Sequence, residues 1–248
     1  MECIVFDCET TGLSPLSGDR ICEIGAVKLK DGKVLDKYWS LINPQRAVSY
    51  AAFMVNKITP GMLRDAPGID DILPDFLKFL GKNKFAAYNA GFDLSFLNAE
   101  LRRFSYDTIS PKDAIDIYIL AKKILPNIKR YPLWNVAKNL NVSIAATHRA
   151  LADAQVAAEV FIRLLERGGD KLLNIVHLNY TGTLKVLENA IQSKNSVNIK
   201  FFSNTGQMLE KNVYPCRIME VKGKDFLEFE FQDKAGSVPI LLIEEVRQ

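Results

Sequence analysis

The order of strand-like and helix-like segments is the feature that most restricts how this chain of 248 residues folds. Apolar strand-like runs come first, and from Ile69 onward strand-like runs alternate with helical patterns. The longest helical pattern stops at Arg167-Gly168-Gly169-Asp170, where two glycines interrupt it. Strands followed by alternating strands and helices predict an α/β domain with a mixed β-sheet flanked by helices over residues 1–167.

Individual elements of this domain follow from the spacing of apolar residues. Strands are expected at Ile4–Phe6, Ile21–Lys30, Val34–Leu41, Phe85–Tyr88 and Asp113–Ile117. Helices are expected at Ile69–Leu80, Phe92–Phe104, Ile117–Leu125 and His148–Glu166. Pro74 lies inside the first of these helices, where it predicts a kink or a restart.

The rest of the chain has a different pattern. One helix is expected at Leu184–Gln192, and four strand-like runs follow it, at Val197–Phe202, Val213–Glu220, Phe226–Phe231 and Val238–Ile243. Short strands separated by glycine-containing loops predict a small β-rich barrel over residues 183–248. Residues 168–182 would link it to the first domain.

The composition excludes several classes of protein. With 48% hydrophobic and 25% charged residues, the composition is that of a folded globular protein and not of an intrinsically disordered one. No apolar run reaches the roughly 18 to 20 residues that cross a bilayer, and Glu2 and Asp7 come too early for a signal peptide. The four cysteines show neither CxxC spacing nor a small disulfide framework. We therefore expect a cytoplasmic protein with no membrane segment.

The net charge of +3 conceals a local cluster of bases. Residues 117–152 contain no acid and six bases: Lys122, Lys123, Lys129, Arg130, Lys138 and Arg149. Such a stretch is either a solvated helical face or a surface that contacts phosphate groups, and charge alone does not separate the two.

Asp7 and Glu9 stand at the end of the first apolar strand. Residues i and i+2 of a strand project to the same side, so the two carboxylates lie together. Two like charges at that distance repel unless a cation lies between them or one group takes a proton. Mg²⁺ prefers such oxygen ligands, although chance pairs of surface acids are also common.

Two further acids occur at helix starts. Asp93 falls in the first turn of the helix after the strand that ends near Tyr88, where an acid can also simply oppose the helix dipole. His148 precedes Asp153 by five residues, an offset of about 140° on an ideal helix. We therefore expect His148 on the loop that enters the helix and Asp153 one turn inside it.

Three segments carry these residues: DCETTGL, YNAGFDLSFL and HRALADA. In this order they resemble the three exonuclease motifs of the DEDD superfamily, which has an RNase H-like fold. The histidine five residues before the last aspartate resembles the DEDDh branch, as in the proofreading epsilon subunit of bacterial DNA polymerase III. The resemblance covers residues 1–166 and includes the segment from Ile58 to Pro67.

This resemblance implies a set of roles. Two Mg²⁺ or Mn²⁺ ions would neutralise charge on the attacking and leaving oxygens of a phosphodiester, held by Asp7, Glu9, Asp93 and Asp153. His148 would be the general base, since histidine changes charge near neutral pH. Thr10 and Leu13 would bind the terminal nucleotide, and Asn89 and Phe92 would line the same region and support the third ligand.

The sequence departs from the family pattern at two places. Many relatives have histidine where Tyr88 stands, and His-Gly where Asn56-Lys57 stand. Neither departure replaces a metal ligand, so both concern recognition of the terminal nucleotide.

The segments Leu187–Ile191, Val197–Phe201, Val213–Pro215 and Ile243–Val246 resemble a WYL domain. The resemblance implies an SH3- or Sm-like β-barrel that binds nucleic acid or small ligands. Asp225-Phe226-Leu227 replaces its name-giving triplet, however, and Pro239–Leu242 has no arginine. A packing or targeting module is therefore at least as well supported as a binding one, and we expect Phe226, Phe229 and Phe231 in the core.

The expected function is a 3′→5′ exonuclease that removes nucleoside monophosphates from the 3′ end of single-stranded DNA. Two alternatives stay open: an exoribonuclease with the same chemistry, and a non-catalytic module that binds nucleic acid. A repair or processing enzyme that acts alone is favoured over a polymerase subunit, because the residues after 167 lead to the barrel. The polymerase partner and the oligomeric state are left open.

Overall fold

The computed structural model describes residues 2–110, 114–125, 128–144, 148–168, 183–202, 208–221, 224–240 and 243–247. The chain forms two compact units, one made of Met1–Ile117 and Leu133–Arg163, the other of Tyr118–Pro132 and Leu164–Gln248. The boundaries expected from the sequence, 1–167, 168–182 and 183–248, stay a prediction, because residues 169–182 lie outside the described part.

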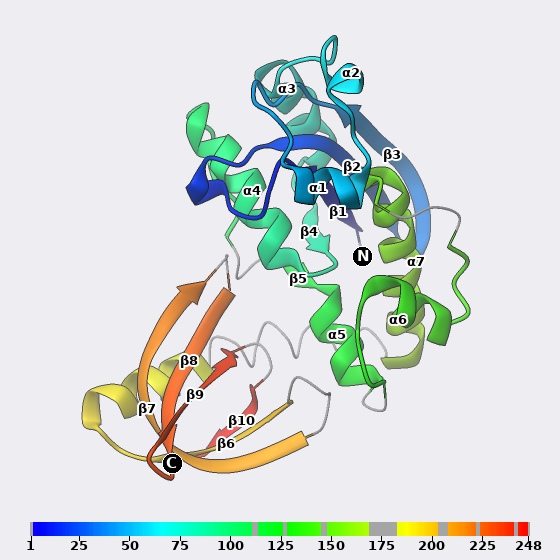
Figure 1. Cartoon of the computed structure of the whole chain (residues 1–248). Coiled ribbons are helices and arrows are strands. Elements are labelled where there is room, and N and C mark those ends of the chain that lie inside the picture. Colours follow the sequence, from blue (N-terminus) through cyan, green and yellow to red (C-terminus); the bar gives the residue numbers. More distant parts are fainter. Residues whose placement is uncertain are drawn as a thin grey trace. The chain divides into compact units, whose positions relative to one another are not determined.

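The first unit is built on a mixed five-stranded sheet, as predicted (Figure 1). Its strands are β1 (Glu2–Thr10), β2 (Ile21–Lys30), β3 (Lys33–Leu41), β4 (Lys84–Ala87) and β5 (Ile115–Asp116), in the order β3-β2-β1-β4-β5. β1 pairs antiparallel with β2 and β2 with β3, whereas β1 pairs parallel with β4 and β4 with β5.

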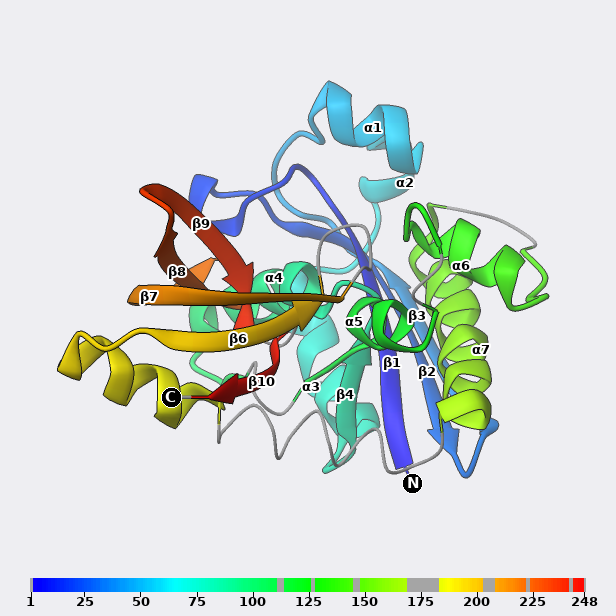
Figure 2. The same ribbon diagram turned by 90° about the horizontal axis from the view of Figure 1, so that it is seen from below.

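Helices cover both faces of this sheet (Figure 2). Those of the first unit are α1 (Tyr50–Asn56), α2 (Pro60–Leu63), α3 (Ile69–Leu80), α4 (Ala90–Arg103), α6 (Leu133–Asn139) and α7 (Ala150–Gly168), with a 3-10 turn at Pro15–Ser17. Ile4, Phe6 and Cys8 of β1 pack in one core with α3 and α4. Because side chains alternate along a strand, Asp7 and Glu9 face the opposite side, where α7 begins.

Several elements differ from the expectation. α1, α2 and α6 are short helices that the apolar pattern did not predict, and α3 runs unbroken through Pro74. The run Val238–Ile243 was wrongly taken as one strand: it contains the end of one strand and the start of the next, with a 3-10 residue at Ile240 between them.

The second unit holds α5 (Ile117–Ile124), a helix over residues 183–193 and a second sheet. That sheet consists of β6 (Val197–Phe202), β7 (Met208–Val221), β8 (Lys224–Phe231), β9 (Lys234–Pro239) and β10 (Ile243–Arg247), in the order β10-β6-β7-β8-β9. All of its described pairings are antiparallel. A β-rich unit is thus present, whereas its closure into a barrel and the WYL assignment stay predictions.

Two of the three aromatic residues of β8 pack in this core, whereas Phe226 is half-buried and lies outside the cluster. Phe229 is buried and Phe231 packs against the same cluster. A Cβ added at Gly236 would lie 2.5 Å from the ring of Phe229, so β9 passes directly over that ring. The ring of Phe229 is therefore enclosed by protein and is not available to stack on a base.

Two of the six bases in the stretch 117–152 have partners within their own unit. Lys122 is fully buried, with its ammonium 4.9 Å from the ring centroid of Tyr118. Arg149 is bound to Glu23 within the first unit. Lys129 and Arg130 are exposed but belong to the second unit, whereas Lys138 belongs to the first. The buried Lys122 therefore belongs to neither a solvated face nor a phosphate-contacting surface, and Arg149 already has a carboxylate partner. For the other four bases the two alternatives stay open.

Two expectations from composition can be compared with the described residues. Cys3, Cys8 and Cys22 are buried free thiols, and Cys216 is an exposed one. Among the described residues, no helix combines the length and the apolar character needed to cross a membrane.

Candidate metal centre

Three carboxylates converge where β1 meets the start of α7. Asp7, Glu9 and Asp153 each offer one oxygen, and the three oxygens lie within 4.8 Å of one another. Asp7 and Glu9 come from one face of β1, and their antiparallel partners on β2 are Gly25 and Glu23. The sequence analysis predicted all three acids and the shared face of the first two.

The two functional residues of the third motif, His148 and Asp153, lie at the start of α7 as expected. His148 has a backbone φ of +59° and lies before the helix, and Asp153 lies in the first helical turn. The His148 N–H donates to Oδ2 of Asp153 at 2.8 Å. The backbone of His148 is thus tied to a candidate metal ligand while its side chain is exposed.

Asp93 reaches the same strand from the other helix. It lies buried in the first turn of α4, and its Oδ1 accepts a hydrogen bond of 3.0 Å from the N–H of Cys8, the residue between Asp7 and Glu9. Among the described residues, Asp93 is not part of the group of three close oxygens. It is adjacent to that group, because its charge raises the pKa of Asp7.

Asn89 and Phe92 shape the beginning of α4. Asn89 precedes the helix with a φ of +69°, and its carbonyl accepts the N–H of Phe92 at 2.9 Å. The ring of Phe92 lies 5.1 Å from that of Phe96, centroid to centroid, and packs against the core. Both residues therefore fix the turn that carries Asp93. A role in binding a nucleotide stays a prediction.

Burial shifts the pKa values of all four acids upward, and nearby negative charges add to the shift. Burial is the largest cause for Asp7, whose pKa lies well above its usual range, and the charges of Asp93 and Glu9 add to it. Burial raises the pKa of Glu9 to about 8 and that of Asp93 to about 7. Burial also raises the pKa of Asp153, although the N–H of His148 opposes the shift.

These acids fit a divalent cation. The three close ligands are carboxylate oxygens, which hard cations such as Mg²⁺ and Mn²⁺ prefer. A cation among them would offset the repulsion and stabilise the ionised forms that burial disfavours. The donor set and its electrostatics therefore agree with the ions implied by the sequence.

The loop after β1 presents one apolar side chain to solvent. Thr10 is buried, and its hydroxyl donates to the carbonyl of Gly12 at 2.6 Å. Leu13 follows and is 72% exposed. A Cβ on Gly12 would lie 2.3 Å from Oδ2 of Asp19, so only glycine fits there without a shift. Of the two residues predicted to contact the nucleotide, Thr10 is thus buried and Leu13 is exposed.

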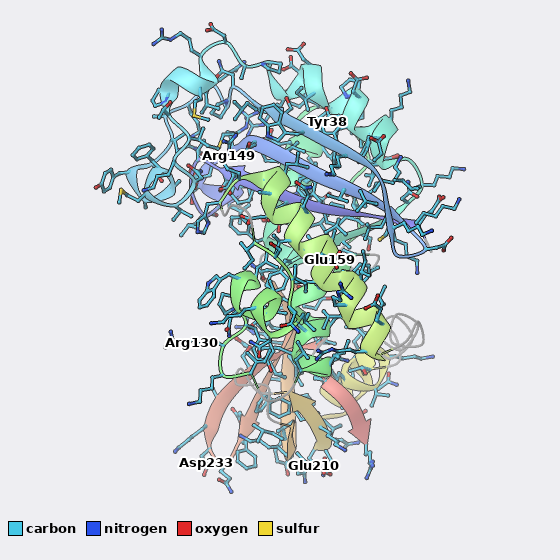
Figure 3. The ribbon with its side chains drawn as sticks, turned by 90° about the vertical axis from the view of Figure 1, so that its right-hand side faces the viewer. Tyr38, Arg130, Arg149, Glu159, Glu210 and Asp233 are labelled. Atoms are coloured by element: carbon cyan, nitrogen blue, oxygen red, sulfur yellow. The ribbon has the colours of Figure 1, made fainter. Side chains whose placement is uncertain are left out.

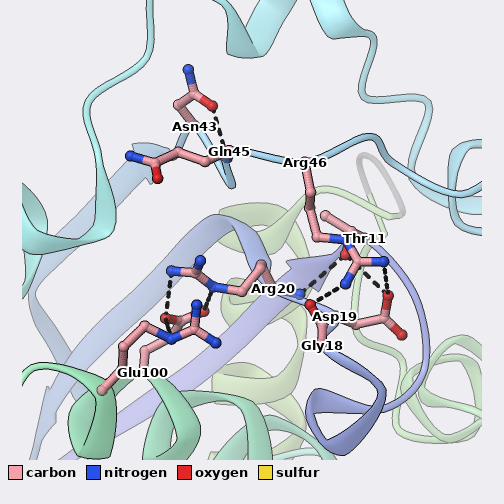
Figure 4. Close-up of polar contacts among 9 residues, drawn as sticks. Thr11, Gly18, Asp19, Arg20, Asn43, Gln45, Arg46 and Glu100 are labelled. Atoms are coloured by element: carbon pink, nitrogen blue, oxygen red, sulfur yellow. Dashed lines mark hydrogen bonds and ion pairs between the residues drawn. The ribbon is translucent and has the colours of Figure 1, made fainter.

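A network of charges and hydrogen bonds holds this loop (Figure 4). The carboxylate of Asp19 accepts the hydroxyl of Thr11 at 3.2 Å and pairs with Arg46 at 3.2 Å. Arg20 then donates to Glu100 of α4 through Nε at 2.6 Å and Nη2 at 2.8 Å. The loop that carries Leu13 is therefore braced at its far end as well as at β1.

Both residues of the departure at Asn56-Lys57 have a definite place in the structure. Asn56 is buried, its amide donates to the carbonyl of Thr10 at 3.4 Å, and its hydrogen bond to Glu9 lowers the pKa of that acid. Lys57 ends α1 with a φ of +57°, a conformation that favours glycine. Asn56 thus supports a candidate ligand, and Lys57 occupies the backbone shape of a helix C-cap.

Glu23 is a residue of this site that the sequence analysis missed. It is fully buried on β2 and accepts hydrogen bonds from Arg149, Ala150 and Trp39. Arg149 lies beside the sheet where α7 starts (Figure 3). The signal was a charged residue inside the apolar run Ile21–Leu29, since such an acid needs partners from elsewhere in the fold.

Comparison with known proteins identifies the first unit. The exonuclease family designated RNase_T matches residues 4–161, which is more than half of the chain. The chain belongs to this exonuclease family. The matched residues include every motif that carries the acids and the histidine, so the candidate metal centre lies within the exonuclease domain.

Relatives of this exonuclease domain occur in much longer proteins. The PolC-type DNA polymerase III of Oceanobacillus iheyensis is 36% identical over 177 residues, which are 71% of this chain but 12% of that protein. The chain thus spans about an eighth of the length of such curated relatives. Its activity, substrates and partners cannot be taken over from the whole polymerase.

Two solved exonuclease structures are similar to the chain. Exonuclease X in complex with 5′-overhanging duplex DNA is 26% identical, with a TM-score of 0.54, over 67% of this chain and 92% of that one. E. coli exonuclease I in complex with a dA16 oligonucleotide is 15% identical, with a TM-score of 0.73, over 100% of this chain and 64% of that one. The second likeness shows a shared fold alone.

Proposed function

We propose that the chain is a metal-dependent 3′→5′ exonuclease of the DEDDh branch that acts on single-stranded DNA and releases nucleoside monophosphates. The observation that carries this proposal is the convergence of Asp7, Glu9 and Asp153 within 4.8 Å, beside Asp93 and directly after His148. DNA is favoured over RNA because the PolC-type relatives are DNA polymerases and exonuclease X was solved with DNA.

Each residue has a task in this proposal. Asp7, Glu9 and Asp153 hold two Mg²⁺ or Mn²⁺ ions, and Asp93 joins them from α4. Bound ions of this kind neutralise charge on the attacking and leaving oxygens of a phosphodiester. His148 takes the proton of the attacking water, and its backbone bond to Asp153 keeps it next to the ligands. Leu13 and Thr10 receive the terminal nucleotide.

A degradation assay tests the proposal. Single-stranded DNA labelled at its 5′ end should give a ladder that shortens from the 3′ end with Mg²⁺ or Mn²⁺, and should stay intact with EDTA. His148→Ala should lower the rate while leaving Mn²⁺ affinity nearly unchanged. Asp75→Asn is the matched control, because Asp75 is an exposed acid on α3, across the sheet from α7. DNA left intact with both metals contradicts the proposal.

The same assay decides between the alternatives. RNA of the same sequence, offered in competition, identifies an exoribonuclease if it is degraded first. Binding of either strand without metal and without turnover identifies a non-catalytic module. The assay needs no polymerase, so it measures the exonuclease activity of this chain by itself. A role in repair or processing stays a prediction.

The remaining expectations stay predictions. Localisation in the cytoplasm rests on composition and on free cysteines. The WYL-like unit has no assigned ligand, and its buried Phe229 favours packing over base stacking. Deleting it and measuring the rate on short and long oligonucleotides would show whether it contributes to substrate binding.

A further inference from the structure

The buried carboxylate of Glu23 is hydrogen-bonded to residues at the start of α7. Its carboxylate is fully buried and accepts Arg149 Nη2 at 2.7 Å, Trp39 Nε1 at 2.6 Å and the N–H of Ala150 at 3.1 Å. Arg149 Nε lies 3.1 Å from both of its oxygens. Two of the three partners are consecutive residues that immediately follow His148. A buried carboxylate is tolerated only with such partners, so the acid and the helix start depend on each other.

Gly25 brings the same helix into backbone contact with β2. A Cβ at this position would lie 2.2 Å from the carbonyl carbon of Ala150 and 2.2 Å from the nitrogen of Leu151. These are backbone atoms, so any larger residue would push α7 away from the sheet. Gly25 therefore sets how closely the first turn approaches, and Glu23 sets where along β2 it rests.

The register between β1 and β2 places Gly25 and Glu23 beside two of the candidate metal ligands. Gly25 pairs with Asp7 and Glu23 pairs with Glu9. The two points at which α7 is held are thus the direct neighbours of two candidate ligands. Asp153, in the first turn of α7, then reaches within 4.8 Å of both.

We propose that Glu23 is a positioning residue for the metal centre: it fixes the first turn of α7 through Arg149 and Ala150, so that Asp153 and His148 meet Asp7 and Glu9. Glu23 itself binds neither metal nor substrate. Trp39 of β3, which pairs with Gly25, completes the arrangement by donating to the same carboxylate. This inference rests on the proposed function for its catalytic consequence, although not for its structural one.

Glu23→Gln is a sharp test because it keeps the shape of the side chain. Oε1 accepts from Trp39 and Arg149, and Oε2 accepts from Ala150 and Arg149. Whichever way the amide is turned, its NH₂ group faces a donor, and the fork with Arg149 is lost. The substitution therefore loosens the start of α7 without leaving a cavity.

Glu100→Gln is the matched control. Glu100 is also buried and also receives two bonds from one arginine, Arg20, but it connects the loop after β1 to α4 instead of α7. Both variants break a buried Arg–Glu fork in the first unit. Only the first variant changes the helix that carries Asp153.

The experiment measures Mn²⁺ binding by titration calorimetry, amide exchange of the metal-free chain, and kinetics on labelled DNA. Loss of an outer-shell partner typically weakens metal binding about 10–100-fold, and we expect that loss for Glu23→Gln, with kcat lowered to a similar extent and KM nearly unchanged. Amides at the start of α7 should exchange faster. Glu100→Gln should keep Mn²⁺ affinity within about two-fold, because Glu100 lies about two turns along α4 from Asp93 and makes no contact with α7 through its fork.

Each outcome decides the inference. Mn²⁺ affinity and α7 exchange that stay at wild-type level in Glu23→Gln overturn it, as does an equal loss of Mn²⁺ affinity in Glu100→Gln. If Glu23→Gln does not fold, Arg149→Lys supplies the test, since Arg149 is partly exposed and lysine keeps its charge without the fork. Wild-type Mn²⁺ affinity in that variant overturns the inference too.

Failure of the proposed function is distinguishable from failure of this inference. If the wild-type chain degrades no nucleic acid but Glu23→Gln still weakens Mn²⁺ binding, the function is wrong and the positioning role stands. If the wild-type chain degrades DNA and Glu23→Gln binds Mn²⁺ and turns over equally well, the positioning role is wrong and the function stands.

Discussion

The exonuclease domain buries charge in two places, and only one of them is balanced. Glu100 and Arg20 form a fork with distances of 2.6 and 2.8 Å, in which each charge has a partner. At the metal centre, four acids repel one another and their pKa values rise, while the nearby Arg149 is bound to Glu23. Balanced charge holds the fold, whereas unbalanced charge is retained for a ligand.

The two places lie at opposite ends of one loop. The loop of residues 11–20 follows Thr10, the last residue of β1, and ends at Arg20, whose fork reaches α4. The loop thus connects the metal centre, whose acids repel one another without a cation, to the Arg20–Glu100 pair, whose charges neutralise each other. Substitutions at the two ends should therefore have opposite effects on stability and activity.

The largest effect is expected at the unbalanced end. Asp7→Asn removes a ligand oxygen and should lower the exonuclease rate at least about 1,000-fold, which corresponds to about 4 kcal/mol of activation free energy. It also removes a buried charge, so the metal-free chain at pH 9 should become more stable by about 1 kcal/mol or more. Denaturant unfolding in EDTA checks the second part. A metal-free variant that is less stable than wild type at pH 9 would contradict the comparison.

At the balanced end, the effect should fall on stability. Glu100→Ala leaves the buried guanidinium of Arg20 without its carboxylate, which should cost about 3 kcal/mol of unfolding free energy. Mn²⁺ affinity below the unfolding transition should stay close to that of wild type. Urea denaturation and Mn²⁺ titration measure the two quantities. Loss of metal binding in the folded variant would show that the two ends are not separate.

The pH dependence sharpens the comparison. Because the pKa of Glu9 is raised to about 8 and that of Asp93 to about 7, the metal-free folded chain holds more protons than the unfolded chain above about pH 4. Stability in EDTA should therefore fall as the pH rises from about 4 to 8, by up to about 1.4 kcal/mol per unit for each proton.

Controls separate this slope from general titration. Glu9→Gln should flatten it near pH 8, and saturating Mn²⁺ should reduce it, because bound metal keeps the ligands ionised in the folded state. Glu100→Ala should lower the whole curve without changing its slope in this window. A curve that rises with pH in EDTA would refute the assignment of the strained site.

The sequence predicted the centre of the site well because short-range geometry determines it. Asp7 and Glu9 share a face by strand alternation, and the five-residue offset placed His148 before α7 and Asp153 within it. The mixed sheet followed from the order of the apolar runs. These features depend on residues that are close in the chain.

Features that depend on distant contacts were missed. The role of Glu23 requires the β1–β2 register and the docking of α7 on Gly25, and neither is visible in a local pattern. The burial of Lys122 likewise contradicts a charge count, because its stem and ammonium pack among Tyr118 and Tyr131. The short helices α1, α2 and α6 have too few turns to show a period.

The smallest effect is expected at the tip of the loop that joins the two ends. Leu13 is 72% exposed, so Leu13→Ala should change stability by less than about 0.5 kcal/mol. If Leu13 packs against the terminal base, losing that contact should raise the KM for single-stranded DNA by about five-fold, or about 1 kcal/mol of apolar burial, with kcat nearly unchanged.

Leu16 provides the matched control, because it lies on the same loop, is 97% exposed and differs only in position. Leu16→Ala should leave KM at the wild-type value. An equal rise in KM for both variants would mean that the loop contributes non-specific apolar contact with DNA. No rise for either would remove Leu13 from the nucleotide site. A rise for Leu13→Ala alone would place the Leu13 side chain at the terminal nucleotide.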